Sequence, residues 1–422
     1  MIVSVPVLPG VHLSAVQTDK FKTGCFSVNL LRPLNRQEAA LNALLPNVLL
    51  RGTQAHPTMQ AISEHLDTLY GASMGPFVRK RGEVQTMGFF ADFLADDLTP
   101  GGEPMLRPMI DFAAEVLLRP VLRAGALDEA YTESEKANLI NAIEANLNEK
   151  RAYAAWRLIR EMCAGEAYGV SRMGEPEEVR AITAQSLTEH WRNVLETSRI
   201  EIFYLGAEAP ETVAAAFREA LGDLPRGTLC APATEVIREA GEPRYVAEAL
   251  DVTQGKLCLG FRTGITAADP DYPALVLLNV VFGAGTTSKL FQNVREKRSL
   301  CYYASSGVEK LKGIMTVSSG IEFDKYDEAL AAILEQLELC RQGEITEQEL
   351  EDARRQLDSA LRLQADAPGA LESFYLGQIV GGLEGSLEEL RERLFAVTKE
   401  QAVAAARKIR LDTVYFLKGV DA

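Results

Sequence analysis

The chain has 422 residues, of which 47% are hydrophobic and 24% are charged, a composition typical of globular proteins and not of disordered or fibrous ones. With 44 Lys and Arg against 59 Asp and Glu, its formal net charge is −15. This charge argues against duplex nucleic acid and anionic membrane surfaces as partners. At roughly 150 residues per domain, the length predicts two to three domains.

The six cysteines are dispersed and include no Cys-x-x-Cys pair, as is typical of reduced thiols in a cytoplasmic protein. Met1–Gly10 lacks the basic start and the long apolar core of a signal peptide. The longest apolar stretch, Ala274–Ala284, is too short to span a bilayer. These features predict a soluble protein in the cytoplasm, without a membrane partner.

Hydrophobic periodicity predicts mixed strands and helices in the first half of the chain. Asn35 is the expected N-cap of the first helix, with Glu38 as its capping-box partner. The expected elements, in order, are strands at 11–17 and 25–31, a helix from 36 to about 50, a helix after Pro57, a strand at 84–93, helices at 105–118 and 127–147, a strand at 200–205 and a helix at 211–221.

The second half repeats this order. Its expected elements are strands at 244–249 and 256–262, helices at 272–282 and 289–297, strands at 303–308 and 313–321, and helices at 324–341 and 346–363. Leu69–Ser73 also resembles Cys301–Ser305, so we interpret the chain as a duplication. The prediction is an α+β protein of two related domains, residues 1–225 and 240–422, joined by the Pro- and Gly-punctuated segment 222–241.

The histidines limit the metal chemistry. The chain has four, at 12, 56, 65 and 190, and no two are four residues apart, so no helix can present the two-imidazole face of a zinc hydrolase. The pairs Glu64-His65 and Glu189-His190 are more typical of solvated helix faces. A displaced metal site built from His56, Glu64, His65 or Asp67 is the alternative that these residues leave open.

Arg295 and Tyr302 form a more promising pair. They are seven residues apart and lie on either side of an expected helix-to-strand turn, so both can reach one point. A guanidinium and a phenol can donate hydrogen bonds to a peptide carbonyl or to the oxyanion that it becomes. The alternative is structural: Arg295 pairs with a carboxylate of its own helix and Tyr302 is half-buried.

The stretch Ser288–Tyr302 resembles the C-terminal-domain signature of the insulinase/pitrilysin-like zinc metallopeptidases, the inverzincins with an inverted His-x-x-Glu-His motif. This resemblance implies two homologous insulinase-like domains, each a mixed β-sheet backed by helices, that face each other across a chamber. It also implies that Arg295 and Tyr302 contact the backbone of a peptide substrate.

The zinc motif itself is lost. On the register of the resemblance, its two histidines and its general-base glutamate fall on Ala43, Asn47 and Pro46, and a third ligand falls on Ala142. A one-residue slip at Ala142 stays open, and Glu135 matches a second family glutamate. Catalytic zinc needs three protein ligands and an open position. We therefore expect no metal, no cofactor and no catalytic residue in this chain.

Three stretches resemble a non-catalytic branch of the family, which is associated with the 5-aminopentanol modification of elongation factor P: Thr18–Thr23, Leu69–Ser73 and Arg157–Cys163. Members of this branch are encoded with a partner that keeps the zinc motif. The resemblance implies a heterodimer in which this chain binds the substrate and the partner supplies zinc. A homodimer in isolation, and a peptide- or protein-binding scaffold without a proteolytic role, are the alternatives.

Overall fold

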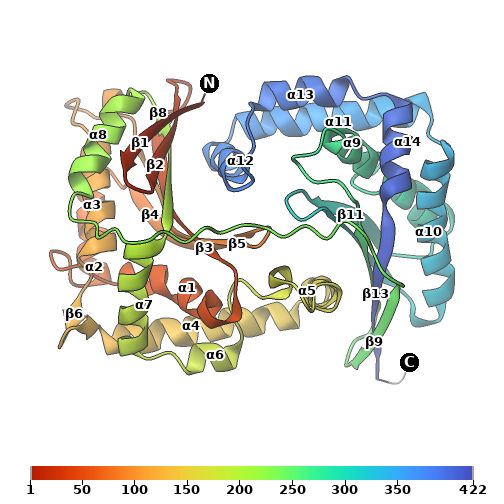
Figure 1. Ribbon diagram of the computed structural model, residues 1–422, viewed down its shortest axis with the longest axis horizontal. Coiled ribbons are helices and arrows are strands. Elements are labelled where there is room, and N and C mark those ends of the chain that lie inside the picture. Colours follow the sequence, from red (N-terminus) through yellow and green to blue (C-terminus); the bar gives the residue numbers. More distant parts are fainter. Residues whose placement is uncertain (1, 421–422) are drawn as a thin grey trace. The chain divides into compact units, whose positions relative to one another are not determined.

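The computed structural model describes residues 2–420, apart from the side chain of Leu147, and the chain divides into two compact units (Figure 1). The first unit contains the residues up to Glu144, Val170–Ala233 and Glu372–Leu376; the second contains Ala145–Gly169, Thr234–Leu371 and the residues from Gly377 onward. The expected linker, 222–241, contains no helix or strand. The domain limits 1–225 and 240–422 stay a prediction.

The first unit is built on a six-stranded sheet in the order β1-β2-β8-β3-β5-β4. Its strands are β1 (Ile2–Leu8), β2 (Val11–Gln17), β3 (Thr23–Pro33), β4 (Ser73–Arg81), β5 (Val84–Leu94) and β8 (Arg199–Gly206). Only β2 and β8 pair in parallel; all other neighbours are antiparallel. A separate two-stranded pair consists of β6 (Leu122–Arg123) and β7 (Ala126–Leu127).

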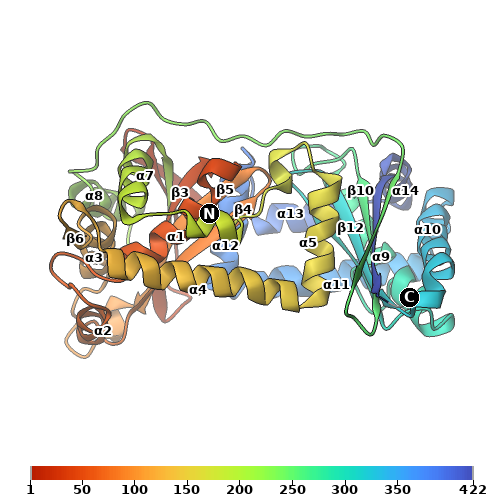
Figure 2. The same cartoon turned by 90° about the horizontal axis from the view of Figure 1, so that it is seen from below.

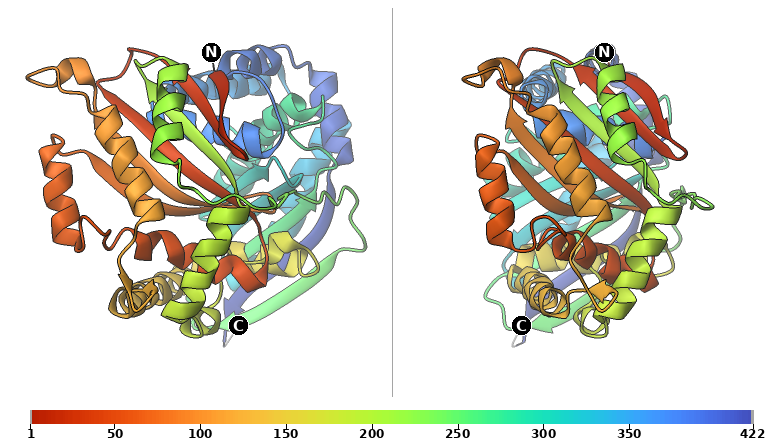
Figure 3. Two further views of the ribbon diagram at one scale, coloured as in Figure 1. Left: turned by 60° about the vertical axis from the view of Figure 1, so that its left-hand side comes forward. Right: turned by 90° about the vertical axis from the view of Figure 1, so that its left-hand side faces the viewer.

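Helices cover one face of this sheet (Figures 1 and 3). They are α1 (Arg36–Leu49), α2 (Met59–Thr68), α3 (Leu106–Leu118), α4 (Glu129–Asn148), α6 (Pro176–Arg180), α7 (Ala184–Thr197) and α8 (Pro210–Ala220), with the short turn η1 (Asp96–Leu98). Alternate residues of β3, such as Phe26, Val28 and Leu30, enter the core beneath them.

The start of α1 confirms one expectation and corrects another. The Asn35 side chain caps the helix by accepting a hydrogen bond from the Glu38 backbone N–H at 2.9 Å. The Glu38 carboxylate does not complete the expected capping box. Both of its oxygens are bound instead by the Arg32 guanidinium, at 2.8 and 2.9 Å, because that charged fork offers a stronger partner than a backbone N–H.

The second unit is built on a five-stranded sheet in the order β11-β12-β10-β13-β9. Its strands are β9 (Arg244–Leu250), β10 (Gly255–Arg262), β11 (Tyr303–Glu309), β12 (Ile314–Ile321) and β13 (Arg410–Gly419). Helix α5 (Lys150–Met162) lies on one face, against β10 and β13, and η2 (Ala167–Gly169) follows it. Figure 2 shows α9 (Tyr272–Phe282), α10 (Tyr326–Gln342) and α14 (Lys399–Lys408) on the opposite face.

The remaining helical elements belong to the C-terminal half of the chain. They are α9 (Tyr272–Phe282), η3 (Leu290–Lys297), η4 (Phe323–Lys325), α10 (Tyr326–Gln342), α11 (Glu347–Ala365), α12 (Pro368–Val380), α13 (Leu387–Phe395) and α14 (Lys399–Lys408). The helix expected at 289–297 is present as η3, but it is a π-helix. The turns of a π-helix are wider than those of an α-helix. They are rare in proteins, and those that do occur are frequently at functional sites.

The two sheets share one topology. The first contains the series β2, β8, β3, β5, β4 and the second contains β9, β13, β10, β12, β11; each begins with a parallel pair and continues antiparallel. The expected α+β fold of two sheet-and-helix halves is therefore confirmed, and β1 is an addition to the first. Among the described residues, no helix is long and apolar enough to cross a membrane.

Candidate functional site

Helix α1 carries three of the positions where the resemblance places the family's zinc motif. The Ala43 side chain is 1% exposed and belongs to the core of the first unit. Pro46 is buried in the helix interior, where it supplies no backbone N–H. The Asn47 amide turns back and donates to the Ala43 carbonyl at 3.0 Å. Ala43 and Pro46 have no metal-ligating side-chain atom, and an asparagine amide is a weak zinc ligand beside imidazole.

A histidine that contacts α1 has a structural role. His190 on α7 is 7% exposed, and its Nε2 lies 2.7 Å from the Asn42 side-chain oxygen, while the Asn42 amide donates to Gln85. Burial lowers the pKa of His190 to about 4, so the ring stays neutral at physiological pH. Sequence reasoning placed this histidine on a solvated face and was wrong: the apolar spacing of Leu187, Trp191 and Val194 turns this side of the helix inward.

Helix α4 carries the remaining positions of the family motif. Ala142 is exposed and has no ligating atom. Glu135, which the resemblance retains, is 9% exposed and accepts a hydrogen bond from Arg51 at 3.0 Å. A one-residue slip would bring Asn141 or Ile143 to this position, and neither side chain is a carboxylate. Glu144, two residues further on, pairs with Arg180 at 3.4 Å. The donor set around α1 and α4 therefore does not fit catalytic zinc.

The alternative metal site is not assembled. His56 and His65 are neighbours, with ring centroids 4.3 Å apart, and His56 Nδ1 lies 3.2 Å from the Glu115 carboxylate. Glu64 instead accepts a hydrogen bond from Gln60. Within residues 2–420, no group of three or more His, Cys, Asp or Glu side chains is arranged to hold a metal ion.

Arg295 and Tyr302 lie at the end of η3 and directly before the edge strand β11. The Arg295 side chain is 41% exposed; its guanidinium lies 4.6 Å from the centre of the Phe291 ring, and its Nε is 3.4 Å from the Glu296 carboxylate. Tyr302 is 60% exposed, and its hydroxyl is 3.4 Å from Glu322. Both polar contacts are long, so solvent or a ligand can compete for these donors.

The turn between the two residues is strained. Ser299 has a φ of +50°, in the left-handed region that residues with a Cβ rarely adopt. Hydrogen bonds on both sides hold it there: its N–H donates to the Arg295 carbonyl at 3.1 Å, and the Leu300 N–H donates to the Val294 carbonyl at 3.1 Å. Local strain of this kind collects at binding and catalytic sites.

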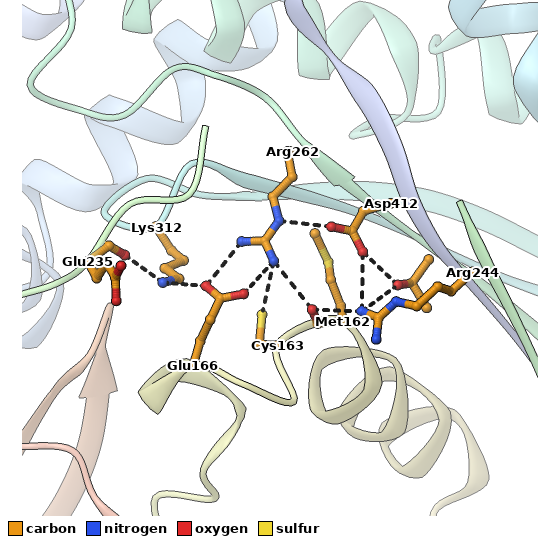
Figure 4. Close-up of polar contacts among 9 residues, drawn as sticks. Met162, Cys163, Glu166, Glu235, Arg244, Arg262, Lys312 and Asp412 are labelled. Carbon is orange, nitrogen blue, oxygen red and sulfur yellow. Dashed lines mark hydrogen bonds and ion pairs between the residues drawn. The ribbon is translucent and has the colours of Figure 1, made fainter. Parts of the chain in front are cut away.

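The stretch Arg157–Cys163 turns out to anchor α5 on the second sheet. Figure 4 shows a buried charge cluster at the end of this helix. Glu166 accepts from Arg262 at 2.5 and 3.1 Å, and its second oxygen lies 2.6 Å from Lys312. Lys312 is fully buried and also donates to the Glu235 carbonyl at 2.5 Å.

Two guanidinium groups complete this cluster and bind the carboxyl end of α5. Arg262 donates to Asp412 at 3.0 Å and to the Met162 carbonyl at 3.3 Å, and Arg244 donates to the same carbonyl at 3.0 Å. Cations beside the last carbonyls of a helix satisfy groups that lack partners within it. Sequence reasoning missed the cluster, since its charges come from five separate segments.

Comparison with known proteins then decides the family. Residues 181–357 match the family model described as Peptidase M16 inactive domain. The probable inactive metalloprotease YmfF of Bacillus subtilis (strain 168) is 34% identical over 98% of this chain and 96% of its own length. The chain belongs to the peptidase M16 inactive-domain family.

Solved structures agree with this membership. A conserved protein from Enterococcus faecalis V583 superposes with a TM-score of 0.90 and 31% identity, covering 100% of this chain and 99% of its own. A peptidase M16 inactive domain from Pseudomonas fluorescens superposes with a TM-score of 0.78 at 20% identity, covering 99% and 98%, and so supports the fold. The chain is thus a non-catalytic relative of the M16 metallopeptidases, as the sequence predicted.

Proposed function

We propose that this M16 chain is the non-catalytic, substrate-binding subunit of a heterodimeric zinc peptidase. A partner of the same family with an intact zinc motif supplies the metal, and this chain itself holds neither metal nor cofactor. Arg295 and Tyr302 bind the backbone of a peptide or protein substrate.

The exposure of Arg295 and Tyr302 is the observation that supports this role best. Side chains that only brace a fold are buried or firmly paired, whereas these two donors are 41% and 60% exposed and their polar contacts are both 3.4 Å long. A guanidinium can only donate and a phenol hydroxyl can donate too, so together they suit a carbonyl oxygen and the oxyanion formed from it.

The substrate belongs to the same proposal. The resemblance to the branch associated with 5-aminopentanol modification of elongation factor P suggests a peptide or protein connected with that process. A net charge of −15 suits a basic or neutral polypeptide better than nucleic acid.

The decisive experiment measures peptide turnover by the reconstituted heterodimer, with pairing followed separately by size-exclusion chromatography. Arg295→Ala and Tyr302→Phe should each lower turnover by about 100- to 1000-fold, the usual effect of removing one oxyanion donor, without changing pairing. Arg298→Ala is the matched control for charge, because Arg298 is 42% exposed but pairs with Glu335 at 2.6 Å. Tyr245→Phe is the control for the phenol, since Tyr245 is 61% exposed.

Wild-type turnover by both Arg295→Ala and Tyr302→Phe, with normal pairing, would refute the substrate-binding role. Tight binding of a peptide or of elongation factor P, with no turnover by a correctly paired complex, would favour the scaffold alternative. Equal losses in the Arg298→Ala control would show that the loss reflects general charge and not contact with substrate.

A further inference from the structure

A cavity of about 550 Å³ lies at one end of the first unit's sheet. The register brings the ends of β2, β5 and β8 and the start of β3 to this edge: Gln17 pairs with Gly206, and Thr23 pairs with Leu94. The cavity is lined by the β2–β3 connection, by η1 and by the start of α3. The proposed function leaves it unused, although the β2–β3 connection contains the stretch Thr18–Thr23.

The floor of this cavity is apolar except for one hydroxyl. Phe93 and Leu106 line it and are 4% and 7% exposed, and Tyr204 is 1% exposed. The Tyr204 hydroxyl accepts a hydrogen bond from the Glu208 N–H at 3.1 Å. Among the described residues no acceptor takes the proton of this hydroxyl. A buried hydroxyl that donates no hydrogen bond destabilises the folded chain, so a bound acceptor oxygen would stabilise the site.

A glycine leaves room beside this hydroxyl. Gly206 also lines the cavity, and a Cβ at this position would collide with the Tyr204 hydroxyl oxygen. Its φ is not in the left-handed region, so the backbone conformation does not require glycine here. The close approach to Tyr204 is therefore the physical reason for a glycine at this position.

Acidic side chains dominate the walls of the cavity. They are Asp19, Asp96, Asp97 and Glu208, against Lys20 and Lys22. Burial is the main cause that raises the pKa of Tyr204 to about 12, and the Glu208 and Asp96 carboxylates raise it further. Asp96 also accepts the Met105 N–H at 2.9 Å, so the exposed carboxylates of Asp19, Asp97 and Glu208 remain to meet a ligand.

We infer that this cavity binds a lysine-type side chain of a peptide. Its alkyl stem packs on Phe93 and Leu106, its ammonium group meets Asp97 and Glu208, and a carbonyl oxygen of the peptide accepts the proton of Tyr204. This binding site lies wholly in the first unit, whereas Arg295 and Tyr302 belong to the second. It needs neither zinc nor a partner. It therefore goes beyond the proposed function and can be tested on the isolated full chain.

The test is calorimetric titration of the isolated chain with N-acetyl-Gly-Lys-Gly-amide at low ionic strength. The norleucine peptide, which keeps the stem and lacks the charge, should bind at least about tenfold more weakly, equivalent to about 1.4 kcal/mol. Asp97→Asn and Glu208→Gln should each raise the Kd of the lysine peptide severalfold. Glu211→Gln removes the same charge from the first turn of α8, outside the cavity, and is the control.

Two further measurements address the hydroxyl and the source of the amine. Tyr204→Phe should weaken binding of the lysine peptide. It should not change binding of n-butylamine, which has no carbonyl. Equal affinity for the lysine and norleucine peptides, or equal losses in Glu211→Gln and Glu208→Gln, would overturn the proposal. Binding of n-butylamine as tight as that of the peptide would also overturn it and identify a free amine as the ligand. None of these outcomes depends on peptidase activity.

Discussion

Glu166 should be the residue on which the second unit depends most. It is the carboxylate that Arg262 and Lys312 share, and their side chains are 3% and 0% exposed. In Glu166→Gln, two buried positive charges lose their common counter-charge. Removing one partner from a buried ion pair costs about 3–5 kcal/mol, and we expect a loss of unfolding free energy in this range.

Lys312→Met should cost less, about 1–2 kcal/mol, since Glu166 stays bound by two nitrogen atoms of Arg262 and the methionine fills the volume. The double variant Glu166→Gln/Lys312→Met should lose less than the sum of the single losses, because the two groups interact directly. A coupling free energy of about 0.5–3 kcal/mol is typical of such neighbours.

Urea unfolding provides the assay. Trp156 lies on α5, in the second unit, and Trp191 lies in the first, so a Trp191→Phe background makes fluorescence report the second unit alone. Glu161→Gln is the matched control: Glu161 is on the same helix and pairs with Arg157 at 3.0 Å, but it is 30% exposed. If Glu166→Gln is no more destabilising than this control, the reasoning on buried charge is wrong.

Three further predictions concern pH and the lost zinc site. Acidification from about pH 6.5 to 4 should destabilise the first unit by up to about 3 kcal/mol. In this range His190 binds a proton in the unfolded chain but stays neutral in the folded chain, because burial lowers its pKa to about 4. His190→Gln should remove this loss from urea unfolding followed by Trp191. The Arg262 and Lys312 hydrogen bonds lower the pKa of Glu166 despite its burial. The Glu166 carboxylate therefore stabilises the folded chain above the carboxyl pKa of the unfolded chain, and this stabilisation should be lost as the pH falls through the pKa of the folded chain. Glu166→Gln should not show this loss. Ala43→His should cost about 1–3 kcal/mol by overpacking and bring no zinc affinity by calorimetry; zinc binding at native stability would contradict this.

Periodicity located the elements that have one clearly apolar face. The strand predicted at 11–17 and the helix predicted at 272–282 have the observed limits of β2 and α9. Strand β4 was missed because Gly75, Pro76 and the basic run Arg79–Arg81 are typical of loops; it is an edge strand, where proline and charge are tolerated. No local pattern could show that β9 pairs with β13, which is more than 160 residues further along the chain.

The site could be predicted only in part, for a related reason. Arg295 and Tyr302 were found through a spacing of seven residues, but the wide turns of η3 and the left-handed Ser299 set their directions. The charge cluster escaped notice because Glu166 and Arg262 each look like ordinary surface residues in their own segments. Only the folded chain brings their charges together and removes them from water.

Pro46 makes the loss of catalysis more than a loss of side chains. A proline in a helix interior costs about 3 kcal/mol relative to alanine, so α1 persists because Ala43, Leu44 and Val48 are buried around it. Restoring the general base would require a carboxylate where the core of the first unit now packs, and restoring the ligands would require imidazoles in the space of Ala43. The second unit keeps its two donors in solvent instead. In the proposed function these donors bind the substrate, and the activated water that hydrolysis needs comes from the partner.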